Sequence, residues 1–223
     1  LPRLGYFADE TQLSPEDTLS HANHYQSMDS DLIDLEIIVS TGKEQTVTAP
    51  GKLLEEWSEG DRKYFHFRPE GKIKFGFGIN SADYKIYHET HKEKDISIYH
   101  HNAHTMCLPK ISYGIKSALD YNTKHFGEYR YDNIKIIEFP LSFGTFATAA
   151  VNTIQISEIR FINDTSHAGD KYTDISFYTA AHEFTHHWWG NQVMPADAAG
   201  ALMITESITE YITAKIYEEQ YGK

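Results

Sequence analysis

The chain has 223 residues, of which 40% are hydrophobic and 13% aromatic, so it can fill a core and is not expected to be disordered. Its net charge of −12 disfavours a nucleic-acid partner, because an acidic chain repels phosphate backbones. Cys107 is the only cysteine and no run of about 18 apolar residues occurs, which excludes an intrachain disulfide and predicts no membrane span.

The first half of the chain is expected to be mainly strands. Residues 1–30 are polar and rich in turn formers, which predicts an irregular lead-in. From residue 32 to 101, short β-branched or aromatic segments alternate with Gly- and Pro-containing turns. The predicted strands are "DLIDLEIIVS", "KYFHFRP", "KIKFGFGI", "DYKIYHE" and "DISIYHH". We therefore expect a β-sandwich or a saddle-shaped sheet over residues 1–100.

The pattern changes near His101, and the second half is expected to mix helices and strands. Residues 103–127 have apolar side chains at helical spacing and end at a glycine. Strands are predicted in "NIKIIEFP" and "VNTIQISEIRFI", a loop in "DTSHAGDKYT", and helices over residues 174–189 and 201–221. The sequence thus predicts an α+β fold with a second domain over residues 101–223 and a seam near residues 95–102.

The motif "HEFTH" at residues 182–186 predicts a zinc site. Positions i and i+4 lie on one face of a helix, so His182 and His186 can bind one ion. Glu183 is rotated by about 100° from His182, which suits a general base acting on a water at the metal better than a ligand. Asp174 is the predicted N-cap of this helix. Histidines grouped on the surface by chance are the alternative.

A catalytic zinc has three protein ligands, so a third is needed. The next predicted helix contains Glu206 and Glu210. Glu206 lies within the apolar stretch "LMITESI", where a buried carboxylate is costly unless it is paired or binds a metal, so it is the better candidate. Glu210, one turn later, is either a group supporting the ligands or a solvated glutamate.

The remaining histidines receive a different interpretation. No helix that could supply a carboxylate follows the pair His88 and His91 or the group His100, His101 and His104. His187 points away from the face that carries His182 and His186. Surface or structural roles are favoured for all of them over metal binding.

"HEFTHHWWGNQV" followed by "TESITEYI" resembles the aminopeptidase N family of gluzincin zinc metallopeptidases. Residues 187–205 separate the second histidine from the glutamate, a spacing of 19 where the best-known members have 18. The longer spacing, with "LPRLGY", "APGKL" and "LDYNTKHFGEYRYDNIKIIEFP", is similar to bacterial peptidase-like domains fused to multi-span membrane permease proteins.

The resemblance implies a saddle-like β-domain up to about residue 100, then a thermolysin-like catalytic domain that is cut short. It implies one zinc per chain, held by His182, His186 and Glu206, with Glu183 as the base. It also implies a peptide substrate, flanking membrane segments outside this fragment, and a soluble domain of a membrane protein, on a membrane side that the sequence leaves open.

Two departures from the family pattern affect the expected specificity. The family's exopeptidases have a glutamate that binds the free α-amine of the substrate, and Ala149 stands at the matching position here. A transition-state tyrosine of the family lies beyond the ligand glutamate, and the sequence ends at Lys223 without it. Loss of such an oxyanion donor typically costs about 10²–10³ in rate.

Three functions therefore remain open. The leading prediction is a zinc metallopeptidase. The rival is a catalytically weak peptide-binding or regulatory zinc domain of a transporter-like membrane protein. The third is an adhesive β-domain that binds no metal.

Overall fold

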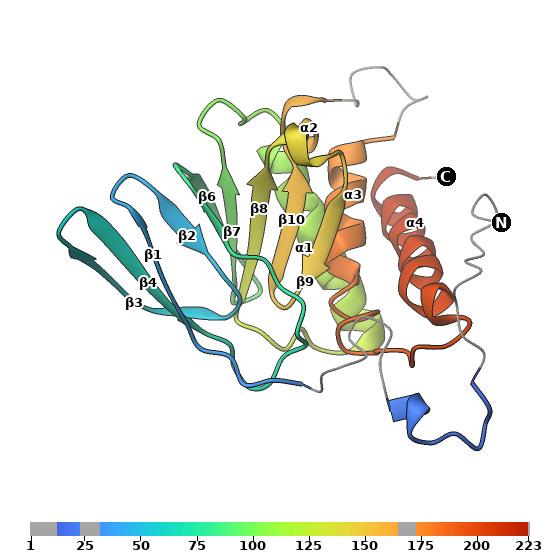
Figure 1. Ribbon diagram of the computed structural model, residues 1–223. Helices are drawn as coiled ribbons and strands as arrows, with labels where there is room; N and C mark the ends of the chain where they lie inside the picture. The colour runs from blue at the N-terminus through green and yellow to red at the C-terminus, as the bar shows by residue number, and fades with distance from the viewer. Residues whose placement is uncertain (1–12, 23–31, 165–172, 223) are drawn as a thin grey trace.

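The computed structural model describes residues 13–22, 32–164 and 173–222. Antiparallel strands of the N-terminal part lie on one side, a larger mixed sheet lies in the middle, and helices lie on the other side (Figure 1). The predicted α+β class, with β-structure first, is confirmed. Most of the predicted lead-in and nearly all of the loop predicted in "DTSHAGDKYT" lie outside the described residues.

Two small antiparallel sheets form the N-terminal part. One has the order β1 (Ile37–Gly42), β4 (Arg62–Arg68) and β3 (Lys52–Glu59), and the other pairs β2 (Thr46–Thr48) with β5 (Asn80–Ala82). Their small core consists of Val47, Ala49, Phe65 and Phe67.

The central layer is a five-stranded mixed sheet. Its strands, in spatial order, are β6 (Lys85–His91), β7 (Lys94–His100), β8 (Asn133–Phe139), β10 (Thr153–Ser157) and β9 (Ala147–Ala150). The three middle strands are parallel, and the two edge strands β6 and β9 run antiparallel to their neighbours. A parallel pair needs a crossover connection, and a long helix provides it between β7 and β8.

The helices are α1 (Leu108–Phe126), α2 (Ile159–Ile162), α3 (Ile175–Thr185) and α4 (Ile208–Tyr221). Helices α1 and α3 pack against this sheet, and α4 packs against α3 and α1. A π-helical turn, Met203–Ser207, leads directly into α4, and two short 3₁₀ turns occur at Ser20–Ala22 and Leu141–Phe143.

The main core lies between the sheet and helices α1 and α3. Every second residue of the middle strands points to this side, as strand geometry requires: Ile96, Ile98, Ile134, Ile136, Ile154 and Ile156, all fully buried. Gly114 allows α1 and α3 to approach closely, because a Cβ there would lie 2.5 Å from the carbonyl oxygen of Phe177. This close packing fixes the position of α3 relative to the sheet.

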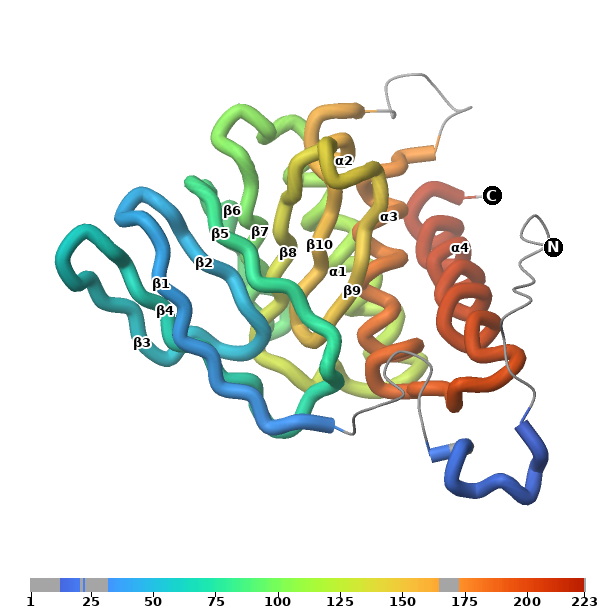
Figure 2. The backbone as a smooth tube through the Cα atoms, viewed as in Figure 1, coloured from blue at the N-terminus to red at the C-terminus, as the bar shows by residue number. Residues whose placement is uncertain are grey.

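Lys135 joins the opposite face of the sheet to the N-terminal part. Its ammonium donates to the carbonyl oxygen of Ala49 at 2.7 Å and to that of Gly51, and lies 4.9 Å from the centre of the Phe67 ring. Burial lowers the pKa of Lys135 to about 7. The chain between β4 and β5 also passes over this face (Figure 2), where Gln155 donates to the Asn80 side chain at 3.2 Å.

Several strand predictions are wrong in detail. "KIKFGFGI" forms no ladder beyond one bridge between Ile73 and Ile33. Gly78 in this segment lies against β10, where a Cβ would meet the Gln155 side chain at 2.1 Å, so close packing replaces strand pairing. The end of "VNTIQISEIRFI" is the short helix α2.

Strands β3 and β9 were not predicted at all. β3 is a largely exposed edge strand with three glutamates, and β9 consists only of Ala and Thr, so neither has a strong strand pattern.

The mixed sheet includes β6 and β7, so it crosses residue 100, where the sequence predicts a domain boundary. The division into domains 1–100 and 101–223 stays a prediction.

None of the helices in the described residues has the length and apolar composition of a membrane span.

Candidate metal centre

Helix α3 holds the two histidines of the motif. Asp174 caps its N-terminus, as predicted, and accepts a hydrogen bond from the backbone N–H of Phe177 at 3.2 Å. The helix ends at Thr185, earlier than the predicted residue 189, but the N–H of His186 still donates to the carbonyl of His182 at 3.3 Å. The two imidazoles therefore remain one turn apart on the same face.

Three donor atoms from two helical segments converge at one point. Nε2 of His182 and Nε2 of His186 lie 3.2 Å apart, and Oε2 of Glu206 lies 3.7 Å from the first and 3.5 Å from the second. Zinc bonds of about 2.0–2.1 Å in a tetrahedron place neighbouring ligand atoms roughly 3.4 Å apart. The triangle therefore fits a single zinc ion with one coordination position left open.

The imidazoles are oriented by groups on their far sides. Nδ1–H of His186 donates to the carbonyl of Trp189 at 3.1 Å, which leaves the Nε2 lone pair free for a metal. Oε2 of Glu210 lies 3.0 Å from Nδ1 of His182, but off the direction of the N–H bond. Tyr178 donates to the other oxygen of Glu210 at 2.7 Å, which holds that carboxylate beside His182.

Glu183 lines the same cavity as the three donor residues and is 7% exposed. Burial raises its pKa, and the nearby imidazoles of His186 and His182 oppose that rise only in part. A carboxylate with a raised pKa holds a proton more readily, which suits a group that must take up and release one.

Glu206 is more exposed to solvent than the sequence predicts. Its side chain is 53% exposed, so the expectation of a carboxylate buried among apolar residues is wrong. Hydrogen bonding from His182 and His186 nevertheless holds its pKa well below the usual range. For His186, burial disfavours the charged ring, but the bond to Glu206 and the charge of Glu183 outweigh it and the pKa is raised. The π-helical turn, rather than burial, brings Glu206 to the histidines.

The donor atoms open onto a cavity of about 200 Å³. The edge strand β9 forms one wall with Ala147, Thr148 and Ala149, and Glu183 and Glu206 are the acidic residues in the lining. Because β9 is an edge strand of the sheet, part of its backbone is available to pair with another strand. β10, its neighbour in the sheet, is enclosed between β8 and β9 and is not an edge strand.

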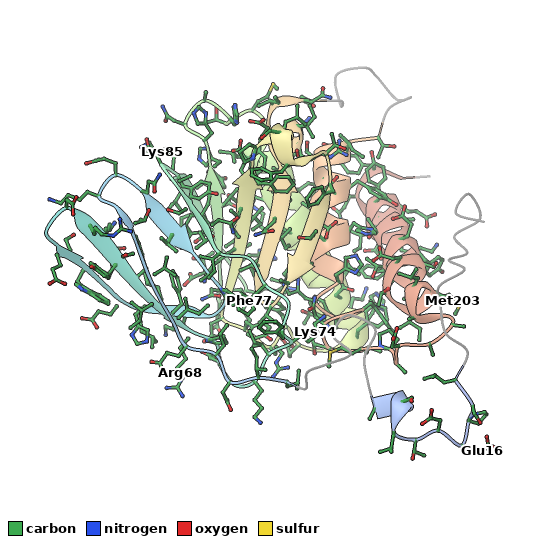
Figure 3. The ribbon with its side chains drawn as sticks, viewed as in Figure 1. Glu16, Arg68, Lys74, Phe77, Lys85 and Met203 are labelled. Carbon is green, nitrogen blue, oxygen red and sulfur yellow. The ribbon has the colours of Figure 1, made fainter. Side chains whose placement is uncertain are left out.

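A hydrogen bond connects the turn after helix α3 to the N-terminal part. Gly190 lines the cavity with φ of 112°, a conformation that favours glycine. The ammonium of Lys74, a side chain labelled in Figure 3, donates to the carbonyl oxygen of Gly190 at 2.6 Å. Burial lowers the pKa of Lys74 to about 8. A residue far away in the sequence therefore helps to fix the mouth of the site.

The structure brings His182, Glu183, His186 and Glu206 together, and their roles stay predictions. Sequence reasoning missed Tyr178, although it lies four residues before His182 on the same helical face. His187 is 1% exposed and packs against Tyr129 and Phe184, and burial lowers its pKa to about 4. It therefore lies in the core, away from the donor triangle.

Comparison with known proteins gives a structural match but no sequence match. No family model matches the chain, and neither does any curated protein. The fold is similar to that of Legionella pneumophila aminopeptidase A, solved in complex with aspartic acid, with a TM-score of 0.71 and 15% identity. The fold matches part of an aminopeptidase. The similarity covers 86% of this chain but only 23% of that one.

Proposed function

We propose that this chain carries the site of a zinc metallopeptidase, with His182, His186 and Glu206 as ligands and Glu183 as general base. The donor triangle carries the proposal, because its edges of 3.2, 3.5 and 3.7 Å suit one tetrahedral zinc. A buried carboxylate beside these ligands and the similarity to an aminopeptidase fold support hydrolysis of peptide bonds as the reaction.

When bound, zinc supplies Lewis-acid chemistry, polarising a carbonyl oxygen and lowering the pKa of water. Glu183 takes the proton from the attacking water and later delivers it to the leaving amine. The carbonyl of Trp189 keeps His186 in the tautomer whose Nε2 faces the cavity. The carboxylate of Glu206 stays ionised because its pKa is low.

The substrate is proposed to be an extended peptide that pairs with β9. Thr148 lies between two alanines on this strand, so small side chains leave the wall of the cavity open to a second backbone. Pairing by backbone hydrogen bonds would bind peptides with little dependence on side-chain identity.

One observation favours a second candidate, a peptide-binding or regulatory zinc domain with weak catalysis. The acidic residues lining the cavity are the proposed ligand Glu206 and the proposed base Glu183, and Ala149 of β9 is apolar. The described wall thus provides no additional carboxylate to bind the free amine of a peptide. This feature argues against strict aminopeptidase specificity, whereas the buried Glu183 argues for catalysis.

The Glu183→Gln variant tests the proposal in the full-length protein. We expect it to keep one zinc per chain and to lose about 10²–10⁴-fold in peptide hydrolysis, because only the proton acceptor is removed. Zinc is measured by elemental analysis and hydrolysis with a peptide library. The matched control is Glu219→Gln on α4, an exposed glutamate that does not line the cavity, which should change neither quantity.

Two results would contradict the proposal in different ways. Hydrolysis that survives Glu183→Gln would remove Glu183 from the mechanism. Stoichiometric zinc with no hydrolysis of any library peptide by the unaltered protein would favour the binding domain instead.

A further inference from the structure

A second group of metal-ligating side chains lies at the carboxyl ends of the three parallel strands. His104 follows β7, Glu138 stands near the end of β8, and Glu158 directly follows β10. One ligand atom from each lies within 4.8 Å of the other two. Carboxyl ends of parallel strands meet at one edge of a sheet, so residues distant in sequence converge here. We call this group the strand-end cluster.

Each carboxylate of the strand-end cluster is fixed by a backbone N–H. Oε2 of Glu138 accepts from His101 N–H at 2.7 Å, and Oε1 of Glu158 accepts from Leu141 N–H at 2.6 Å. The other oxygen of each carboxylate faces Nδ1 of His104, with Glu138 Oε1 in direct contact and Glu158 Oε2 at 3.9 Å. Metal sites are typically built in this way, with groups behind the ligands that orient them.

The charges of the strand-end cluster are not balanced by the protein groups around it. Glu138 is only 5% exposed, and a single imidazole faces both carboxylates. The adjoining cavity of about 490 Å³ is lined by a further acid, Asp83, and no lysine or arginine appears among its lining residues. Asp83 itself pairs with Lys85 at 3.2 Å, and His104 is the ion-pair partner that Glu138 and Glu158 share. Two carboxylates this close repel one another unless a cation or a proton intervenes.

We propose that the strand-end cluster binds a divalent first-row transition metal such as zinc or manganese, separately from the proposed catalytic site. One imidazole nitrogen and two carboxylate oxygens suit such ions, and the open cavity admits water to complete the coordination. The ordinary alternative is an ion pair between His104 and Glu138 with Glu158 as a bystander.

A metal at this position would stabilise the connection that leads to β9. Glu158 holds the N–H of Leu141 at the start of the 3₁₀ turn, and the next residue back, Ser157, donates to the carbonyl of Gly144 at 2.7 Å. The chain then enters β9, which forms a wall of the other cavity. The inferred role of the ion is structural, and it does not depend on hydrolysis at the first site.

The test measures zinc bound per chain after the full-length protein is equilibrated with micromolar zinc chloride and desalted. We expect about two equivalents for the unaltered protein, about one for Glu206→Gln, about one for Glu158→Gln, and essentially none when both changes are combined. The control is His66→Gln, which removes a histidine paired with Glu36 at 2.7 Å outside either three-donor group. It should leave the ratio unchanged.

No bound zinc in the unaltered protein would overturn the proposal, and so would a Glu158→Gln variant that still binds as much zinc as the unaltered protein. A single equivalent that is lost in Glu158→Gln and kept in Glu206→Gln would support the strand-end cluster and count against the first site. If Glu158→Gln does not fold, His104→Gln replaces it. Loss of one equivalent in Glu206→Gln with full retention in Glu158→Gln would leave the first site standing and reduce the strand-end cluster to an ion pair.

Discussion

The two groups of histidine and carboxylate side chains in this molecule are assembled in different ways. In the first, which we call the helix cluster, His182 and His186 are brought together by one turn of α3, and only Glu206 has to be supplied from elsewhere. In the strand-end cluster, all three members come from separate strand ends. Local helix geometry therefore lets the helix cluster be recognised in the sequence. The strand-end cluster can be recognised only once the topology of the sheet is known.

The largest expected effect is the loss of hydrolysis in a variant of the helix cluster, which would show that the two clusters have different functions. We predict that Glu206→Gln weakens zinc binding at the helix cluster by more than about 100-fold and abolishes peptide hydrolysis, because a carboxamide is a poor ligand. Glu158→Gln should leave hydrolysis within a few-fold of the unaltered protein. Metal titrations and hydrolysis rates of both variants test this. If Glu158→Gln abolished hydrolysis and Glu206→Gln left it intact, the strand-end cluster would be the catalytic one.

A smaller effect is expected from the group behind His182. Glu210→Gln should weaken zinc binding at the helix cluster by about 10–100-fold, since the carboxylate 3.0 Å from Nδ1 of His182 supports the ligand ring. Tyr178→Phe removes the hydrogen bond that positions Glu210 and should have a weaker effect in the same direction. Competition with a zinc chelator measures both, and unchanged affinity in Glu210→Gln would mean that this glutamate is merely solvated.

The last prediction concerns stability rather than metal binding. Lys135 is a buried charge that lies three residues before Glu138 on β8 and has carbonyl partners instead of a counter-ion. Its folded pKa of about 7 lies below the unfolded value of about 10.4. Between these values the unfolded chain binds the extra proton, so stability should rise with pH, by up to about 1.4 kcal/mol per pH unit. Below pH 7 this contribution disappears, because both states are protonated.

Lys135→Met should flatten that slope between pH 7 and pH 9 in urea unfolding experiments. Parallel slopes for the variant and the unaltered protein would indicate that Lys135 keeps its proton when folded. In that case a buried charge costs less in this protein than we infer, and so does the buried carboxylate of Glu138 without a metal.

The comparison also explains how much of the site could be predicted. The spacing of His182 and His186 is a property of any helix, and an N-cap aspartate can be read from the residues that follow it. Glu206 was chosen for a burial that it does not have, and its actual position depends on the π-helical turn. The sequence favours a structural role for His104 because no helix that could supply a carboxylate follows it, whereas strand ends bring Glu138 and Glu158 to it.

The same distinction applies to the fold. The α+β class and helix α1 follow from periodic patterns that each segment carries by itself. Residues 72–79 have the composition of a strand, but they pack through glycine onto Gln155 instead of pairing. β9 has almost no pattern, because its strand character comes from β10 beside it. Long-range contacts override local preference in both segments.

The π-helical turn at Met203–Ser207 determines the direction in which Glu206 points relative to the side chains of α4, the helix that follows it. A π turn contains one residue more than an α turn. The side chains before the turn are therefore rotated about the helix axis by about 100° relative to those after it. Ile212 and Ile216 can therefore stay in the core while the carboxylate is aimed at the histidines. Shortening the turn by one residue would force a choice between core packing and ion coordination, so this stretch should tolerate point substitutions far better than any change in length.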